Sequence, residues 1–149
     1  IRLSLVGSEM CIETVLKLAA DEIIPEQMTP QIDIDAVLDL QDINSKFMSE
    51  LKKMNPFGPD NQKPVFCSLG VKDYGTSKLV GKDLEHIKLE LIDDKSNTPI
   101  HGIAFGMRQH NTHIKNMKPF NICYTIEENT YNGNTSLQLM VKDIKENDI

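Results

Sequence analysis

The feature that most constrains the fold of this chain is a series of strand-like segments separated by turns between residues 64 and 146. In residues 86–92, for example, apolar side chains alternate with polar ones, which predicts a strand with one buried face and one solvated face. One short stretch, at about residues 107–117, is predicted to be helical or irregular. Strands are predicted at residues 65–80, 86–92, 100–107, 120–128 and 136–144.

The turn residues point to a barrel. Gly70 and Gly75 are expected to bend the long first strand, because glycine is typical of bulges and sharp bends within strands. Asn132 and Gly133 predict a hairpin between the last two strands, since both residues tolerate a positive φ. Five short strands, with a long curved first one and a non-strand insertion between the third and fourth, are typical of an OB-fold barrel. An SH3-like barrel or a small sandwich has a similar number of strands, so periodicity alone leaves these alternatives open.

The first 25 residues are predicted to be a fragment of another domain. Residues 1–6 alternate like a short strand, and residues 12–23 place their apolar side chains on one helical stripe. A lone strand and helix cannot form a core, so this segment is interpreted as the tail of a preceding domain. The chain starts at Ile1 rather than Met, and residue 1 is therefore expected to lie inside a longer protein.

Residues 26–64 are predicted to connect that fragment to the barrel. Within them, Ile32 and Ile34 alternate with Asp33 and Asp35, which predicts a half-buried strand over residues 31–40. Two carboxylates at i and i+2 are compatible with metal binding or acid/base chemistry. Because no third ligand is nearby, a solvated acidic edge is the favoured interpretation.

A helix is predicted to follow this strand, with Asn44 as its N-cap. It is expected to end before Pro56 and Gly58, which cannot continue a helix. The predicted apolar face consists of Ile43, Phe47, Leu51 and Met54.

The composition excludes a transmembrane protein. The chain is 40% hydrophobic and 26% charged, and no apolar run approaches the ~20 residues that a membrane span needs. Three cysteines, Cys11, Cys67 and Cys123, are odd in number and far apart, which matches neither a disulfide framework nor the close pairs of a zinc site. They indicate buried thiols in a reducing cytoplasm.

The net charge of −6 argues against a dominant non-specific DNA-binding surface, but the charge is unevenly distributed. Residues 1–60 contain 5 basic and 11 acidic residues, whereas residues 61–149 contain 11 of each. Residues 101–118 contain no Asp or Glu, and this basic island carries His101, Arg108, His110, His113, Lys115 and Lys118. His110 and His113, spaced i and i+3, allow a metal pair on a helical turn. Without a Cys, Asp or Glu in the same stretch, a solvent-facing basic loop that touches DNA is favoured.

Four stretches carry a more specific signal. They are NPFGPDNQKPVF at residues 55–66, LVGKDLEHIKLELID at 79–93, GIAFGM at 102–107 and YTIEENTYNGNTSLQLMVKDIK at 124–145. In order and spacing they resemble the C-terminal region of the RecJ family of single-strand-specific DNA exonucleases. The resemblance covers about residues 26–145.

The resemblance implies an α+β architecture in three parts. Residues 1–25 are the remnant of a DHHA1-type domain, residues 26–64 a strand-helix connector, and residues 65–146 a five-stranded OB-fold barrel. The family digests single-stranded DNA from the 5′ end, with Mn²⁺ or Mg²⁺ held by Asp and His side chains of an upstream phosphoesterase domain. This sequence contains no Asp-His-His triplet, so no catalytic residue, metal ligand or cofactor is expected here, and the chain alone is predicted to be inactive.

Binding of single-stranded DNA by a small barrel requires cations along the phosphates and flat side chains on which bases stack. The usual surface of an OB fold is the outward face around its second and third strands, with the adjoining loops. If Ala104 faces the interior, Phe105 faces outward. The electrostatic candidates are Lys78, Lys82, His86, Lys88 and Arg108, and the stacking candidates are Tyr74, Phe105 and Tyr131.

The predicted function is therefore to guide single-stranded DNA toward a nuclease centre in upstream domains of the same cytoplasmic protein, in DNA repair and recombination. Two alternatives remain. The acidic residues between Asp33 and Asp42 suggest a protein-interaction module that docks a basic partner or the upstream domains. The barrel could equally serve as a structural clamp that closes the nuclease around its substrate.

Overall fold

The structure, a computed structural model, describes residues 31–96 and 98–146. The predicted strand at residues 1–6, the helix at 12–23 and the domain remnant over residues 1–25 lie outside the described residues. The chain divides into two units, residues 1–33 and 34–149, and the fold given below is that of the second unit. Within the described residues, no helix has the length and hydrophobicity that crossing a membrane requires.

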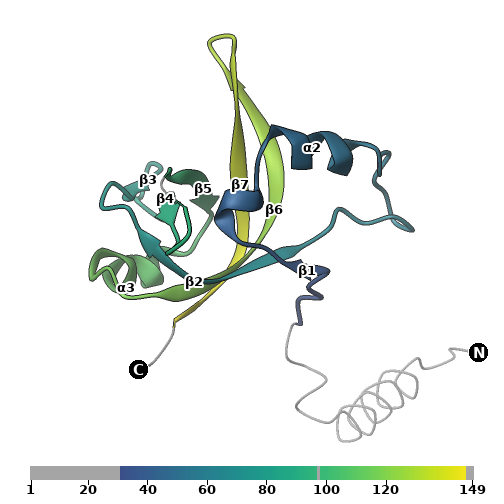
Figure 1. Cartoon of the computed structure of the whole chain (residues 1–149). Helices are drawn as coiled ribbons and strands as arrows, with labels where there is room; N and C mark the ends of the chain where they lie inside the picture. The colour runs from purple at the N-terminus through teal and green to yellow at the C-terminus, as the bar shows by residue number, and fades with distance from the viewer. Residues whose placement is uncertain (1–30, 97, 147–149) are drawn as a thin grey trace, which may run out of the picture. The chain divides into compact units, whose positions relative to one another are not determined.

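A single mixed sheet forms the body of this unit, in the strand order β1-β2-β6-β7-β5-β4-β3 (Figure 1). The strand β5 runs parallel to β7 and β1 runs parallel to β2, whereas the other pairs are antiparallel. The described strands are β1 (Ala36–Val37), β2 (Phe66–Asp73), β3 (Lys78–Val80), β4 (His86–Ile92), β5 (Ile100–Ala104), β6 (Phe120–Tyr131) and β7 (Asn134–Glu146).

An additional pairing between β2 and β4 makes five of these strands close on themselves. The end of β2 pairs with the end of β4, through Lys72 opposite Ile92 and Asp73 opposite Leu91. The helix α3 (Asn111–Lys115), preceded by the 3-10 turn η3 (Arg108–His110), separates β5 from β6. The non-strand insertion was predicted at this position.

Between residues 64 and 146 the structure has six strands, β2 to β7, where five were predicted. The expected long strand over residues 65–80 is interrupted at residues 74–77 and becomes β2 and β3. The interruption is held by Asp73, whose carboxylate accepts hydrogen bonds from the backbone N–H of Ser77 (3.2 Å) and from its hydroxyl (2.5 Å). A side chain that binds the backbone four residues later favours a turn over a continuous strand.

The predicted strand over residues 31–40 is wrong for most of its length. Only Ala36–Val37 form β1, while Ile32 and Ile34 are 38% and 46% exposed. The carboxylate of Asp35 accepts the backbone N–H of Val65 (2.9 Å), and the N–H of Asp35 donates to the carbonyl of Val65 (2.9 Å). These two hydrogen bonds join Asp35 to Val65 without extending β1 toward residue 31. The side chains of Ile32 and Ile34 therefore have no buried face to pack against.

The predicted helix is confirmed as α2 (Ser45–Lys52). The side chain of Asn44 accepts hydrogen bonds from the backbone N–H groups of Lys46 (3.0 Å) and Phe47 (3.1 Å), which makes it the N-cap. Leu51 is buried and Phe47 packs against the core, as predicted. Met54 is 51% exposed instead, because it lies beyond the last helical residue.

One hydrophobic core holds these elements together. Ile87, Leu89 and Leu91 of β4 are fully buried, and Leu40, Ile43 and Leu51 from the segment before β2 join the same cluster. Burial of one such side chain contributes about 1.5–3 kcal/mol. The core also contains the hydroxyl of Tyr124, which lies 2.7 Å from that of Ser68. Burial raises the pKa of Tyr124, so this phenol stays neutral.

The strands β6 and β7 continue as a long hairpin that projects from the rest of the sheet (Figure 1). Their pairing runs from Phe120 opposite Glu146 to Tyr131 opposite Asn134. The two-residue turn between them has positive φ at Asn132 (50°) and Gly133 (79°), which confirms the predicted hairpin turn.

Candidate nucleic-acid interface

The outward face of β3, β4 and β5, with the loop at residues 81–85, contains most of the predicted binding residues and is called the β3–β5 surface below. It exists because β4 alternates strictly. Leu89 is fully buried, Lys88 is exposed, and His86 is half-buried with 28% of its side chain accessible. The inward and outward residues of β4 are therefore those predicted from its sequence.

Two lysines face each other on the β3–β5 surface. Lys78 of β3 is directly opposite Lys88 of β4 in the antiparallel pair. Both side chains are exposed, and within the described residues neither has a carboxylate in ion-pair range. Like charges directly opposite each other destabilise a sheet. An anion bound between the two lysines removes that repulsion.

An exposed aromatic ring lies on the same face. Ala104 is fully buried, so Phe105 points outward and is 55% exposed, as expected for an inward Ala104. The ring of Phe105 contacts that of His86 edge-on, with centroids 5.0 Å apart and an interplanar angle of 75°. The backbone N–H of Gly106 donates to His86 Nδ1 at 3.0 Å.

The remaining candidates lie in the loop at residues 81–85, at the end of β2 and at the tip of the β6–β7 hairpin. Lys82 is exposed in the loop at residues 81–85, where Asp83 and Glu85 reduce the local positive charge. Tyr74 is 51% exposed at the end of β2, and its backbone N–H donates to the carbonyl of Glu90 in β4 (2.8 Å). Tyr131 lies at the end of β6, at the tip of the projecting hairpin (Figure 1), and its side chain is not among those described.

Besides Asp83 and Glu85 in the loop, the strands of the β3–β5 surface contribute one carboxylate. Glu90 points outward from β4, one alternation beyond Lys88. It accepts a hydrogen bond from Thr76 Oγ1 (2.5 Å) and lies 3.5 Å from His101 Nδ1. These contacts partly satisfy the charge of Glu90, so it opposes phosphate binding less than a free carboxylate does.

The basic island divides into free and engaged cations. Arg108 is exposed at the start of η3, and no carboxylate among the described residues lies in ion-pair range of it. Lys115 instead donates to the carbonyl of Ser77 and lies 3.9 Å from the buried carboxylate of Asp73. It therefore links α3 to the turn between β2 and β3.

The prediction that His110 and His113 form a solvent-facing loop is wrong. Their side chains are only 18% and 10% exposed, and both Nδ1 atoms contact the carboxylate of Glu146, at 2.8 and 3.1 Å. Glu146 comes from the end of β7, more than 30 residues away, so the acid-free sequence around the histidines gave no sign of it. Across the described part of the chain, no group of His, Cys, Asp and Glu side chains is arranged to hold a metal ion.

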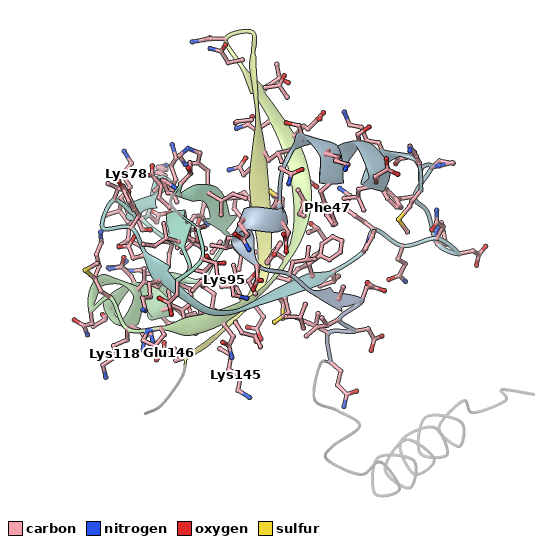
Figure 2. The ribbon with its side chains drawn as sticks, viewed as in Figure 1. Phe47, Lys78, Lys95, Lys118, Lys145 and Glu146 are labelled. Atoms are coloured by element: carbon pink, nitrogen blue, oxygen red, sulfur yellow. The ribbon has the colours of Figure 1, made fainter. Side chains whose placement is uncertain are left out.

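Several lysines elsewhere in the described unit are paired with carboxylates. Near α2, Lys52 contacts Glu128 (2.7 Å) and Lys63 contacts Glu127 (2.6 Å). We call α2 together with Lys63, Glu127 and Glu128 the α2 region. In the view of Figure 2, Lys78 lies at the left of this unit and Phe47, a residue of α2, lies at its right. Lysines without an ion pair also occur elsewhere among the described residues, at Lys46, Lys118, Lys142 and Lys145. The β3–β5 surface differs in that two such lysines, Lys78 and Lys88, are direct cross-strand partners.

Sequence reasoning missed the residues that support this surface. Gly81 and Gly106 both have positive φ and both contact or approach His86, and Asp73 braces the turn before β3. The glycines were visible in the sequence, but their proximity to His86 depends on the pairing of β4 with β3 and β5. Nothing in the sequence separates them from ordinary turn glycines.

The chain was then compared with known proteins. A family model described as the RecJ OB domain matches residues 34–143. No curated protein matches the chain.

Two similar solved structures are those of RecJ from Thermus thermophilus in complex with Mg²⁺ and with Mn²⁺. The Mg²⁺ complex has a TM-score of 0.69 at 13% sequence identity, covering 93% of this chain and 20% of that one. The Mn²⁺ complex has a TM-score of 0.67 at 16% identity, with coverages of 91% and 18%. At these identities the likeness concerns the fold, and this chain spans only about a fifth of either protein.

Proposed function

This chain belongs to the RecJ OB domain family, and from that premise we propose that it is the single-stranded-DNA-binding part of a RecJ-type exonuclease. In this proposal the five strands that close on themselves are the OB barrel, and residues 1–25 are the end of a DHHA1-type domain. The parent protein acts in the cytoplasm in DNA repair and recombination, and cleaves DNA from the 5′ end. Its catalytic domains lie upstream in the same chain.

The observation that carries the proposal is the combination of unpaired cations and an exposed aromatic ring on one face. Lys78 and Lys88 provide two positive charges that have no ion-pair partner among the described residues, and Phe105 provides a flat apolar surface beside them. Phosphate binding releases counterions, and base stacking contributes roughly 1–3 kcal/mol per base. Neither interaction reads base identity, so the binding is tolerant of sequence.

The residues have separate roles in this mechanism. The lysines and Arg108 hold phosphates, with the guanidinium of Arg108 able to bind two phosphate oxygens at once. Phe105 stacks on an unpaired base, which a duplex does not present. The surface thereby favours single-stranded over double-stranded DNA and keeps the strand extended as it passes toward the nuclease centre.

Mg²⁺ or Mn²⁺ in the parent enzyme belongs, in this proposal, to the upstream domains. The two Thermus structures were determined with these ions. The described residues of this chain do not include a set of ligands that fits either one. This chain therefore contributes to hydrolysis by binding the strand and not by activating water, and alone it is inactive.

The test is a fluorescence-anisotropy titration of a labelled oligo-dT with this chain at low and moderate salt. Binding that weakens with salt and exceeds binding to a duplex of equal length supports the proposal. As a control, Lys46→Glu reverses an exposed lysine on α2, outside the β3–β5 surface, and should bind oligo-dT like the wild type. Equal binding of single strand and duplex, or no binding at low salt, contradicts the proposal.

A second candidate function, docking of a protein segment, is favoured by an apolar edge in the same unit. Ile34, just before β1, is 46% exposed, and Val37 within β1 is 61% exposed. The strand β1 is an edge strand with only β2 as its neighbour among the described strands. A groove of about 440 Å³ next to it is lined by residues including Phe47, Met54 and Phe66. Exposed apolar edges are typical sites of strand or domain docking. Substitution of Val37 by Lys tests this function without altering the β3–β5 surface.

A further inference from the structure

His86 is constrained from three sides on the β3–β5 surface. Its ring contacts Phe105 edge-on at a centroid distance of 5.0 Å. Its Nδ1 accepts the backbone N–H of Gly106 at 3.0 Å. On the third side, a Cβ added to Gly81 would be 3.1 Å from His86 Cδ2, so the loop at residue 81 approaches the ring closely. The position also has φ +96°, which side-chain-bearing residues rarely adopt.

These contacts give His86 a role other than that of a phosphate-binding cation. Nδ1 is occupied as an acceptor, so the proton of the neutral imidazole resides on Nε2. Nε2 lies 3.6 Å from the carboxylate of Glu85, which competes with any phosphate for it. Both ring nitrogens of His86 therefore face groups of the protein, the N–H of Gly106 and the carboxylate of Glu85.

Phe105 benefits from this arrangement. An exposed phenyl ring ordinarily loses rotamer freedom when a ligand binds, and a ring held in advance avoids that loss. The single edge-on contact with His86 covers at most one of the two faces of Phe105, and 55% of the residue stays accessible. One face is therefore both fixed in direction and open to a ligand.

We propose that His86 is a positioning residue that holds Phe105 as the stacking platform for one unpaired base. The proposal rests on the function given above, in which Phe105 stacks on a base, and adds to it the residue that prepares this stacking site. Lys88 is two residues from His86 on the same face of β4, a distance of roughly 6–7 Å along a strand. A phosphate of the same strand can therefore reach Lys88 while the base reaches Phe105.

The test compares two oligonucleotides of equal length and charge, oligo-dT and its abasic analogue, bound to the intact chain. For His86→Ala, we expect affinity for oligo-dT to fall about three- to tenfold while affinity for the abasic strand is unchanged. Phe105→Leu should show the same pattern with an equal or larger loss, because a full stack is worth about 5- to 150-fold. Lys88→Ala, the matched control, should weaken both ligands equally.

The double variant His86→Ala with Phe105→Leu separates positioning from an independent contact. If His86 acts through Phe105, the double variant binds oligo-dT no more weakly than Phe105→Leu alone. Losses that multiply, or a His86→Ala variant that weakens both oligonucleotides equally, overturn the proposal. Thermal unfolding monitors the fold. If His86→Ala is unfolded, His86→Asn, which keeps an acceptor for the Gly106 N–H, replaces it with the same expected pattern at a smaller loss.

The outcomes also separate this inference from the proposed function. If the wild-type chain binds neither oligonucleotide, the proposed function fails and the inference fails with it. If the wild type binds oligo-dT and Phe105→Leu weakens that binding while His86→Ala retains full affinity, only the inference is overturned.

Discussion

The β3–β5 surface and the α2 region use the same residue type in opposite ways. In the α2 region, Lys52 and Lys63 each lie within 3 Å of a glutamate carboxylate on β6. On the β3–β5 surface, Lys78 is placed directly opposite another lysine. The comparison teaches that net charge says little about where an anion can bind. A chain of net charge −6 can place two lysines directly opposite each other in one region while glutamates neutralise its lysines in another.

The largest effects are expected in the core under the two regions. Leu89→Ala removes a fully buried side chain from the inner face of β4 and should lower the free energy of unfolding by about 2–5 kcal/mol. Leu51→Ala, under α2, should destabilise the unit as well. Denaturant titration measures both losses.

DNA binding then separates the two variants. At a temperature where both are folded, Leu89→Ala should bind oligo-dT more weakly, because the strand under the β3–β5 surface is altered. Leu51→Ala should bind like the wild type. Equal losses of affinity would mean that the two regions are not functionally distinct.

Charge reversal gives the next largest effect. Lys78→Glu with Lys88→Glu should lower affinity for oligo-dT by about tenfold or more, roughly 1.4 kcal/mol. The slope of log affinity against log salt should become shallower by about 1.4, since each phosphate contact on a single strand contributes about 0.7. Lys52→Glu with Lys63→Glu changes the net charge identically and should leave affinity within about twofold. Equal losses would show that total charge, and not the β3–β5 surface, governs binding.

Charge removal should produce smaller effects of opposite sign on stability. Lys78→Gln relieves the repulsion with Lys88 and is expected to raise the free energy of unfolding by about 0.2–1 kcal/mol. Lys63→Gln breaks an exposed ion pair with Glu127 and is expected to lower it by a similar amount. Thermal unfolding at low salt, repeated at 1 M salt, checks both signs. A loss of stability in Lys78→Gln would indicate that the lysine has a structural role.

The smallest effect is expected at Asp93, which follows β4 and accepts a hydrogen bond from the backbone N–H of Leu40 in the segment before α2. Burial alone would raise the pKa of Asp93, but hydrogen bonds from the backbone N–H groups of Leu40, Ser96 and Lys95 lower it below its usual value of 3.8. A carboxyl group with a lowered folded-state pKa contributes stability above its unfolded pKa and loses it as pH falls through the folded pKa. Asp93→Asn should therefore reduce the melting temperature near pH 7, and its difference from the wild type should shrink as pH falls below 3.8. A difference that is independent of pH would contradict this assignment.

The elements predicted best are those whose pattern is local. The strand β4, the cap of α2 at Asn44 and the turn at Asn132-Gly133 each follow from neighbouring residues alone. The prediction of a strand over residues 31–40 was wrong. Alternation of apolar and polar residues forms a strand only where a neighbouring strand lies on the correct side and in the correct register. The structure supplies one short parallel neighbour there, over two residues.

The candidate site shows the same limit. The sequence left Phe105 open between an outward and a core position, and the burial of Ala104 in the structure places it outward. The engagement of His113 by Glu146 did not follow from the sequence, because the two residues meet only through the pairing of β6 with β7 and the position of α3. Pairings between distant segments decide which charges are free, and a single sequence does not display them.

The β6–β7 hairpin is a projecting arm whose length can change only in discrete steps. Its two-residue turn fixes the register of the pairs from Tyr131 opposite Asn134 back to Tyr124 opposite Val141, beyond which the register shifts by one residue. Adding one residue to either strand would turn all subsequent side chains to the wrong face. Adding one residue to each strand preserves the turn but exchanges the faces at the tip, and adding two to each restores them while lengthening the arm by about 6.6 Å. The arm can therefore be lengthened without exchanging its two faces only in steps of four residues. The distance to which the tip extends takes discrete values for this reason.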